Sequence, residues 1–307
     1  RQIFQTSYGH VAHTVPEQMT GKVKGYVLGM VAAATYGMNP LFALPLYADG
    51  MNAEGILFFR YLFALPMMWL IARGRGGQLW VGRRAMVSLG ALGLVFALSS
   101  LTLFLSYNYM DAGIASSLLF VYPIMVAVIM TCVFGERLRL STVGCILMAL
   151  GGIWMLYNGE EGATLSVAGT ALVFLSSLSY AVYLVYINRS GLGKVPTSVV
   201  TFYVLLFGWG LFVAMAVYDG GITVPATPWL WGNLLGLALF PTAISLLCTT
   251  RAIHYIGSTP TAILGALEPV TAVIIGVTVF GEQLTLREIG GIVLILVAVS
   301  FVVAKKT

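Results

Sequence analysis

The sequence predicts an all-α integral membrane protein with ten transmembrane helices, arranged as two inverted repeats of five helices each. Three observations predict this class: the composition, the spacing of the apolar stretches and an internal repeat. Of the 307 residues, 59% are hydrophobic and 9% are charged, whereas soluble domains have about 45–50% and about 25%. This composition excludes an ordinary soluble enzyme, a nucleic-acid-binding module and a disordered chain.

Apolar stretches follow one another along the whole chain. They lie at 25–46, 53–72, 85–107, 112–134, 140–157, 167–187, 197–217, 229–253, 259–280 and 286–304. A helix needs about 20 mostly apolar residues to cross roughly 30 Å of hydrocarbon, and each stretch has about that length. The connections at 109–112 and 135–139 hold only a few residues, so consecutive helices must run antiparallel.

The charge of the connecting segments alternates along the chain. One set carries the basic residues Lys22, Lys24, Arg73, Arg75, Arg83, Arg84, Arg137, Arg139, Arg189, Lys194, Lys305 and Lys306. The other set holds Asp49, Asp111, Glu160, Glu161 and Asp219, with Arg287 as its one cation. Because Lys and Arg stay on the cytoplasmic side, we expect a multi-pass protein of the cytoplasmic (inner) membrane with both termini in the cytoplasm.

An internal repeat divides the chain into two halves. The segment 134–140 (FGERLRL) reappears 146 positions later as 280–286 (FGEQLTL), and the same offset pairs Pro123 with Pro269. We therefore expect a polar tail at 1–21, a first repeat at 22–158 and a second repeat at 159–307. Because five spans are an odd number, the second copy enters the membrane from the opposite side. Inverted repeats are typical of secondary transporters, although duplication could also simply build a larger bundle.

The Phe-Gly-Glu corners of the two repeats predict a local structure. Gly135 and Gly281 permit the left-handed backbone that ends a helix. Glu136 and Glu282 are then expected near the N-terminus of the next helix, where the helix dipole favours a carboxylate.

These features resemble a known family. Ten spans in two halves, a Phe-Gly-Glu-x-Leu corner in each half and the Glu268-Pro269 pair are similar to the EamA branch of the drug/metabolite transporter superfamily. Within this branch the chain resembles YddG-type exporters of aromatic and other amino acids. The resemblance implies ten helices around a central cavity that opens alternately to each side of the membrane.

Two ionisable side chains lie within predicted spans, Arg60 in the second and Glu268 in the ninth. Such groups are costly in a bilayer and usually face the bundle interior. Arg60 is a candidate for binding a substrate carboxylate, and Glu268 for binding an ammonium group or carrying a proton. The alternative is that each side chain only stabilises the bundle.

Hydroxyl, amide and aromatic side chains supply the other candidate substrate contacts. They are Tyr36, Asn39, Ser99, Tyr107, Tyr122, Ser179, Tyr180, Tyr183 and Ser245. Hydroxyls in membrane helices often only join neighbouring helices, which is the alternative for each. As a set they predict a cavity for an amphipathic solute, because aromatic faces attract ammonium groups.

Prolines within spans predict bends. Pro40, Pro123, Pro241 and Pro269 each remove a backbone donor and are candidate hinges of the transport cycle, or else static kinks.

The function expected is alternating-access export of aromatic and other neutral amino acids and related amphipathic solutes. The alternatives are export of other small metabolites or cationic drugs, and an intramembrane enzyme. The chain has no G-x-x-x-x-G-K-[ST], H-E-x-x-H or G-x-S-x-G motif, so we expect no catalytic residues. We also expect no metal or cofactor. The expected partners are a small-molecule substrate and the lipid bilayer, without nucleic acid, in a monomer or weak homo-oligomer.

Overall fold

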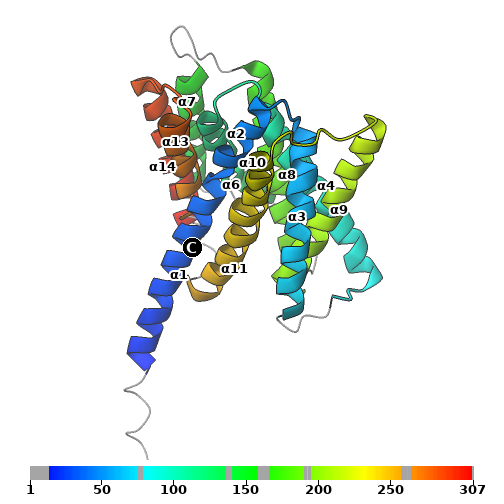
Figure 1. Ribbon diagram of the computed structural model, residues 1–307. Helices are drawn as coiled ribbons and strands as arrows, with labels where there is room; N and C mark the ends of the chain where they lie inside the picture. The colour runs from blue at the N-terminus through cyan, green and yellow to red at the C-terminus, as the bar shows by residue number, and fades with distance from the viewer. Residues whose placement is uncertain are drawn as a thin grey trace, which may run out of the picture.

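The computed structural model describes residues 14–74, 79–135, 140–157, 166–189, 192, 195–256, 261 and 264–305. All regular secondary structure within these ranges is helical. The helices form an elongated bundle, and α1 projects beyond the others at one end (Figure 1).

The first half of the chain supplies five spans. They are α1 (Thr14–Gly37) with α2 (Asn39–Ala48), α3 (Ala53–Gly74), α4 (Arg83–Ser106), α5 (Ala112–Leu119) with α6 (Tyr122–Phe134), and α7 (Leu140–Tyr157). The first and fourth spans are therefore each broken into two helices. The helix α1 already begins at Thr14, within the segment expected to be a polar tail, because a helix satisfies its own backbone and can continue beyond the apolar stretch.

The second half supplies the other five spans. They are α8 (Val167–Arg189), α9 (Thr197–Tyr218), α10 (Pro228–Ala238) with the π-helix η2 (Leu239–Ile244) and α11 (Ser245–Ile256), α13 (Leu267–Val279), and α14 (Leu286–Lys305). The ten spans agree with the ten apolar stretches of the sequence.

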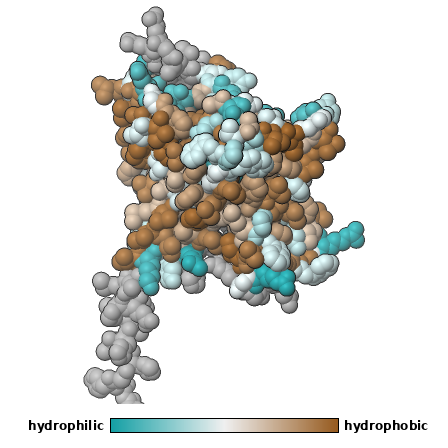
Figure 2. All heavy atoms as spheres, viewed as in Figure 1, coloured by the Kyte–Doolittle hydropathy of each residue, from teal (hydrophilic) through white to brown (hydrophobic). Residues whose placement is uncertain are grey.

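The surface of the bundle matches a bilayer. Hydrophobic residues cover most of the face drawn in Figure 2, and hydrophilic residues gather toward its two ends. Seven of the described helices are long and apolar enough to cross a membrane, and shorter apolar helices lie at Ile146–Met155 and Leu267–Val279. The protein is therefore a multi-pass membrane protein.

The main helix contacts join the two halves of the chain. The helix α1 packs against α11, α4 against α8, α3 against α9, and α7 against α14. The first two pairs correspond to one another, because the repeat relates the first span to the sixth and the third span to the eighth. The two halves thus interlock about an approximate two-fold axis.

A hydrogen bond shows that the repeats are inverted. Glu282, just beyond the end of α13, accepts a hydrogen bond of 3.1 Å from the N–H of Ala112, the first residue of α5. From there the fourth span runs 23 residues to Phe134, or about 35 Å at 1.5 Å per residue. The corner glycines Gly135 and Gly281 therefore lie at opposite ends of the bundle, and both have φ of 69°.

The prediction that Glu282 lies at the start of the next helix is wrong. The N–H of Glu282 donates to the Gly276 carbonyl at 3.0 Å, and this turn directs the side chain back to α5. Glu288 serves α14 instead, because it accepts from the Thr285 N–H at 2.7 Å while its own N–H donates to the Thr285 hydroxyl. Glu136 lies outside the described residues.

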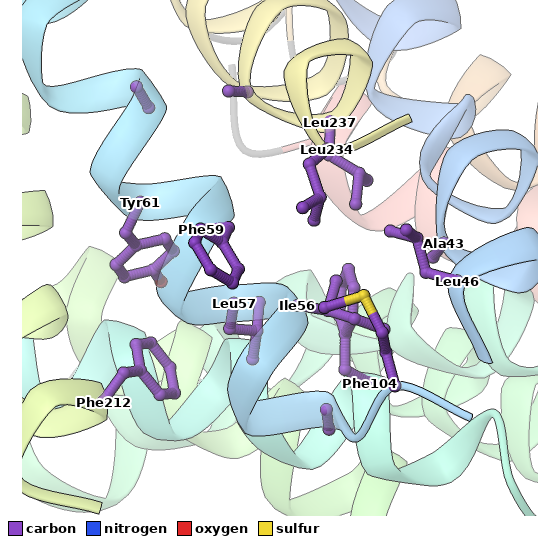
Figure 3. Packing of buried hydrophobic residues seen from close by; sticks show 14 of the residues in the cluster. Ala43, Leu46, Ile56, Leu57, Phe59, Tyr61, Phe104, Phe212, Leu234 and Leu237 are labelled. Atoms are coloured by element: carbon purple, nitrogen blue, oxygen red, sulfur yellow. The ribbon is translucent and has the colours of Figure 1, made fainter. Parts of the chain in front are cut away.

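Close packing holds the helices together. Ile56 and Leu57 of α3 lie in one buried cluster with Leu234 and Leu237 of α10 and Phe104 of α4, and the Tyr61 ring of α3 lies beside Phe212 of α9 (Figure 3). Small residues bring backbones near one another, since a methyl group at Gly152 of α7 would lie 2.7 Å from the Gly291 carbonyl of α14. In a bilayer such packing, rather than hydrophobic burial, is the main source of helix association.

Candidate functional site

Irregular backbone occurs in the middle of four spans, at the predicted prolines. Pro40 and Pro123 are each the second residue of a new helix after a break, and Pro269 follows the turn at 265–266 as the third residue of α13. Pro241 lies within η2. The predicted bends are present, and a hinge role for these prolines stays a prediction.

Arg60 lies inside the bundle without an acidic partner. It follows Phe59 and precedes Tyr61 in α3, and its side chain is only 6% exposed. Its Nε donates a 3.0 Å hydrogen bond to the Thr242 hydroxyl, and its guanidinium carbon lies 5.4 Å from the centre of the Phe104 ring. Within the described part of the chain, no carboxylate pairs with this guanidinium.

Glu268 is the second residue of α13, directly after the turn in the ninth span. Under the repeat offset of 146, Glu268 is equivalent to Tyr122, so each half has a polar side chain directly before its proline. The helix α1 passes close by, because a methyl group at Gly37 would collide with the Glu268 carbonyl oxygen. No described residue donates a hydrogen bond to the Glu268 carboxylate.

Tyr36 lies near both charged groups. The charges of Arg60 and Glu268 both act on its hydroxyl, although the two residues form no ion pair with each other. Asn39, one turn further along the same span, donates from Nδ2 to the Tyr36 carbonyl at 2.8 Å. Opposite charges therefore lie on different helices around a shared tyrosine.

An aromatic wall adjoins Glu268. The Tyr122 and Tyr180 rings meet edge to face with 4.7 Å between their centres, and Tyr180 stacks on Tyr183 at 5.8 Å. Phe96 continues the wall, 5.1 Å from Tyr183. The Glu268 charge acts on the hydroxyls of both Tyr122 and Tyr180, so the carboxylate lies within electrostatic range of this wall.

Several of these side chains keep part of their surface accessible although they lie deep within the protein. They are Tyr36, Tyr122, Tyr180, Tyr183 and Glu268. Partial access at such a depth is expected of side chains that line an internal space.

The other predicted contacts lie at the edges of this group. Ser99 donates to the Ser176 carbonyl of α8 at 3.0 Å, and Ser245 donates to the Ala32 carbonyl of α1 at 3.0 Å. Both hydroxyls therefore join helices. Ser179 is buried on α8 beside Tyr180, and the buried Tyr107 hydroxyl lies near Ser116 without a hydrogen bond of ordinary geometry.

Two residues near the site have roles that sequence reasoning missed. Thr242 holds Arg60. Tyr61 joins α3 to α4 and to the aromatic wall, through a 2.7 Å hydrogen bond with Ser100 and a stacked contact with Phe96. Pro241 gave a signal for an irregular helix at Thr242, but nothing in the sequence paired that residue with Arg60. Within the described ranges, no three His, Cys, Asp or Glu side chains could together hold a metal ion.

Comparison with the sequence models of protein families assigns this chain to a family. The model of the EamA-like transporter family matches residues 23–158 and again residues 167–304. The chain belongs to the EamA-like transporter family. The two matches agree with a protein built from two copies of one unit, as the internal repeat predicts.

Known proteins similar to this chain show how far the similarity extends. The chain is 29% identical to the transporter sll1319 of Synechocystis over 78% of its length and 76% of that protein, and 26% identical to a transporter of Archaeoglobus fulgidus over 88% and 93%. It is 26% identical to the threonine/homoserine exporter RhtA of Salmonella typhimurium over 76% of each chain. A solved crystal structure with 17% identity shares the fold, with a TM-score of 0.66 over 91% of this chain and 96% of the other.

Proposed function

We propose that this EamA-like protein is a secondary transporter that exports neutral amino acids, aromatic ones included, across the cytoplasmic membrane. The observation that carries the proposal is a pair of opposite charges near Tyr36 that do not pair with each other, the buried Arg60 and the half-buried Glu268. Unpaired charges inside a membrane protein are expensive, and their usual role is to bind a solute or ion.

An amino acid supplies the missing partner for each charge. Its carboxylate matches the guanidinium of Arg60, because arginine binds carboxylates through a planar pair of N–H groups. Its ammonium group matches the Glu268 carboxylate and the faces of Tyr122 and Tyr180. The similarity to RhtA, a threonine/homoserine exporter, supports amino acids as the substrate class.

The aromatic wall bears on which amino acids are carried. The rings of Tyr180, Tyr183 and Phe96 offer apolar area to a large side chain. A highly phosphorylated cargo would need several buried cations, and Arg60 is the one basic residue among the buried charged groups of the described chain.

The interlocked inverted repeats support alternating access as the mechanism. Two halves with the same internal structure can exchange conformations, and the bound solute then faces first one side and then the other. The broken spans at Pro40, Pro123 and Pro269 are the proposed points of bending.

Reconstitution into liposomes tests the proposal. Purified protein is expected to give saturable uptake of labelled phenylalanine and threonine, each competed by the other, with and without a pH gradient. Arg60→Gln should abolish this uptake, whereas Arg83→Gln at the start of α4 should not. Saturable flux of cationic drugs without any amino-acid flux would instead support the alternative of a cation exporter, which the aromatic wall beside Glu268 also suits.

A further inference from the structure

Thr242 connects an unusual stretch of helix to the buried arginine. It lies in η2, the π-helical segment Leu239–Ile244, and is 4% exposed. Its hydroxyl donates to the Leu237 carbonyl at 3.0 Å and accepts from the Arg60 Nε at 3.0 Å. One hydroxyl group therefore bridges the eighth span and the second span.

The π-helical turn fixes the direction of this hydroxyl. A threonine in a regular α-helix donates to a carbonyl three or four residues earlier, but Thr242 donates to a carbonyl five residues earlier. Because the hydroxyl proton is committed to Leu237, the oxygen can only accept from Arg60. Short π-helical segments are frequent at functional sites.

This contact decides which edge of the guanidinium remains for a ligand. Nε is occupied by Thr242, and the Phe104 ring lies 5.4 Å from the guanidinium carbon. The two terminal nitrogens have no hydrogen-bond partner among the described residues. A carboxylate can therefore bind end-on to the terminal nitrogen pair, in the two-pronged geometry that arginine favours.

We propose that Thr242 is a positioning residue that holds Arg60 for end-on binding of a substrate carboxylate, and so makes the site select amino acids over analogues that lack the carboxylate. The inference rests on the proposed function and adds to it the residue that sets its selectivity. Leu234 and Leu237, which lie close to α3 in Figure 3, hold the eighth span against the helix that carries Arg60.

The test compares two probes that differ only in the carboxylate. Uptake into liposomes is measured for phenylalanine and for phenethylamine, which keeps the ring and the ammonium group. Thr242→Val removes the acceptor at nearly constant volume and is expected to weaken the apparent affinity for phenylalanine about tenfold, as for hydrogen bonds to charged groups. The affinity for phenethylamine should change less than about twofold, because Arg60 does not contact it.

Two further variants separate positioning from packing. Thr242→Ser keeps the hydroxyl and should restore phenylalanine affinity. Thr201→Val, at a buried threonine of α9 that bonds only its own helix, should change neither affinity. Equal losses for both probes in Thr242→Val would overturn the positioning role while leaving the transport function intact. A wild-type protein that carries neither probe would overturn the proposed function and this inference together.

Discussion

Ser99 and Ser245 occupy equivalent places in the two halves and make equivalent hydrogen bonds. They are 146 residues apart, the offset of the internal repeat. Ser99 of α4 donates to the Ser176 carbonyl of α8, and Ser245 of α11 donates to the Ala32 carbonyl of α1, each at 3.0 Å. Ala32 and Ser176 are 144 residues apart, close to this offset, and each lies in the first span of its half. The same hydrogen bond therefore occurs twice, once on each side of the approximate two-fold axis.

This symmetry predicts similar costs for removing either hydroxyl. Ser99→Ala and Ser245→Ala should each lower the stability of the protein in detergent by about 0.6 kcal/mol, the average for hydrogen bonds between membrane helices. Thermal unfolding checks this expectation, with Thr278→Ala at an exposed position of α13 as the control. Weakened phenylalanine affinity at unchanged stability would show that these hydroxyls bind substrate instead.

Glu268→Gln should impair transport while leaving the fold intact. The change keeps the size of the side chain but removes the charge that an ammonium group would meet. Hydrogen bonds to charged groups predict a loss of about tenfold or more in phenylalanine affinity. Liposome uptake measures this, with Glu54→Gln at the start of α3 as the control. Normal flux in Glu268→Gln would exclude this carboxylate from the mechanism.

Tyr180→Ala should weaken the binding of large aromatic substrates more than the binding of small polar ones. Tyr180 contacts both Tyr122 and Tyr183, so its removal opens the centre of the aromatic wall. The energies of aromatic contacts of this kind predict that the affinity for phenylalanine falls by about threefold to tenfold, with little change in the affinity for threonine. Competition assays measure both values. Tyr180→Phe should behave like the wild type, as should Tyr186→Ala at an exposed position of the same helix. Equal losses for both substrates would indicate a packing defect.

Much of the fold follows from sequence patterns that depend on the bilayer. Twenty-residue apolar stretches and the repeated Phe-Gly-Glu corner predict ten spans in two inverted halves, because a membrane permits few other arrangements. Pro40, Pro123, Pro241 and Pro269 predict the irregular backbone, because a proline cannot donate to a helix.

The partners of individual side chains could not be predicted in the same way. The sequence predicts Arg60 as a charge within the bundle, but its contact with Thr242 joins residues 182 positions apart through a π-helical turn. Glu282 was assigned to the wrong helix, because its partner Ala112 lies in the other half of the chain. Both contacts depend on how the halves interlock, and hydrophobic periodicity within one helix contains no information on that.

The junction of α13 with α5 predicts a pH dependence of stability. Burial raises the pKa of Glu282, and the nearby Asp111 charge raises it further. Burial, with the Glu288 charge, also raises the pKa of Asp111. The folded protein therefore binds protons more tightly than the unfolded chain, whose carboxyl groups titrate near about pH 4. This stabilising contribution is complete below that range and is lost as the pH rises through the raised pKa values.

Glu282→Gln removes the titration but keeps an oxygen that can accept from the Ala112 N–H. The melting temperature of the wild type in detergent should fall as the pH rises above about 4, and that of Glu282→Gln should fall less steeply over the same range. Asp219→Asn, in the exposed loop after α9, should leave the slope unchanged. If the melting temperature of Glu282→Gln fell with pH as steeply as that of the wild type, the Glu282 carboxylate would be ionised throughout this pH range. The junction would then be stabilised by the charge of Glu282 at the start of α5 rather than by its proton.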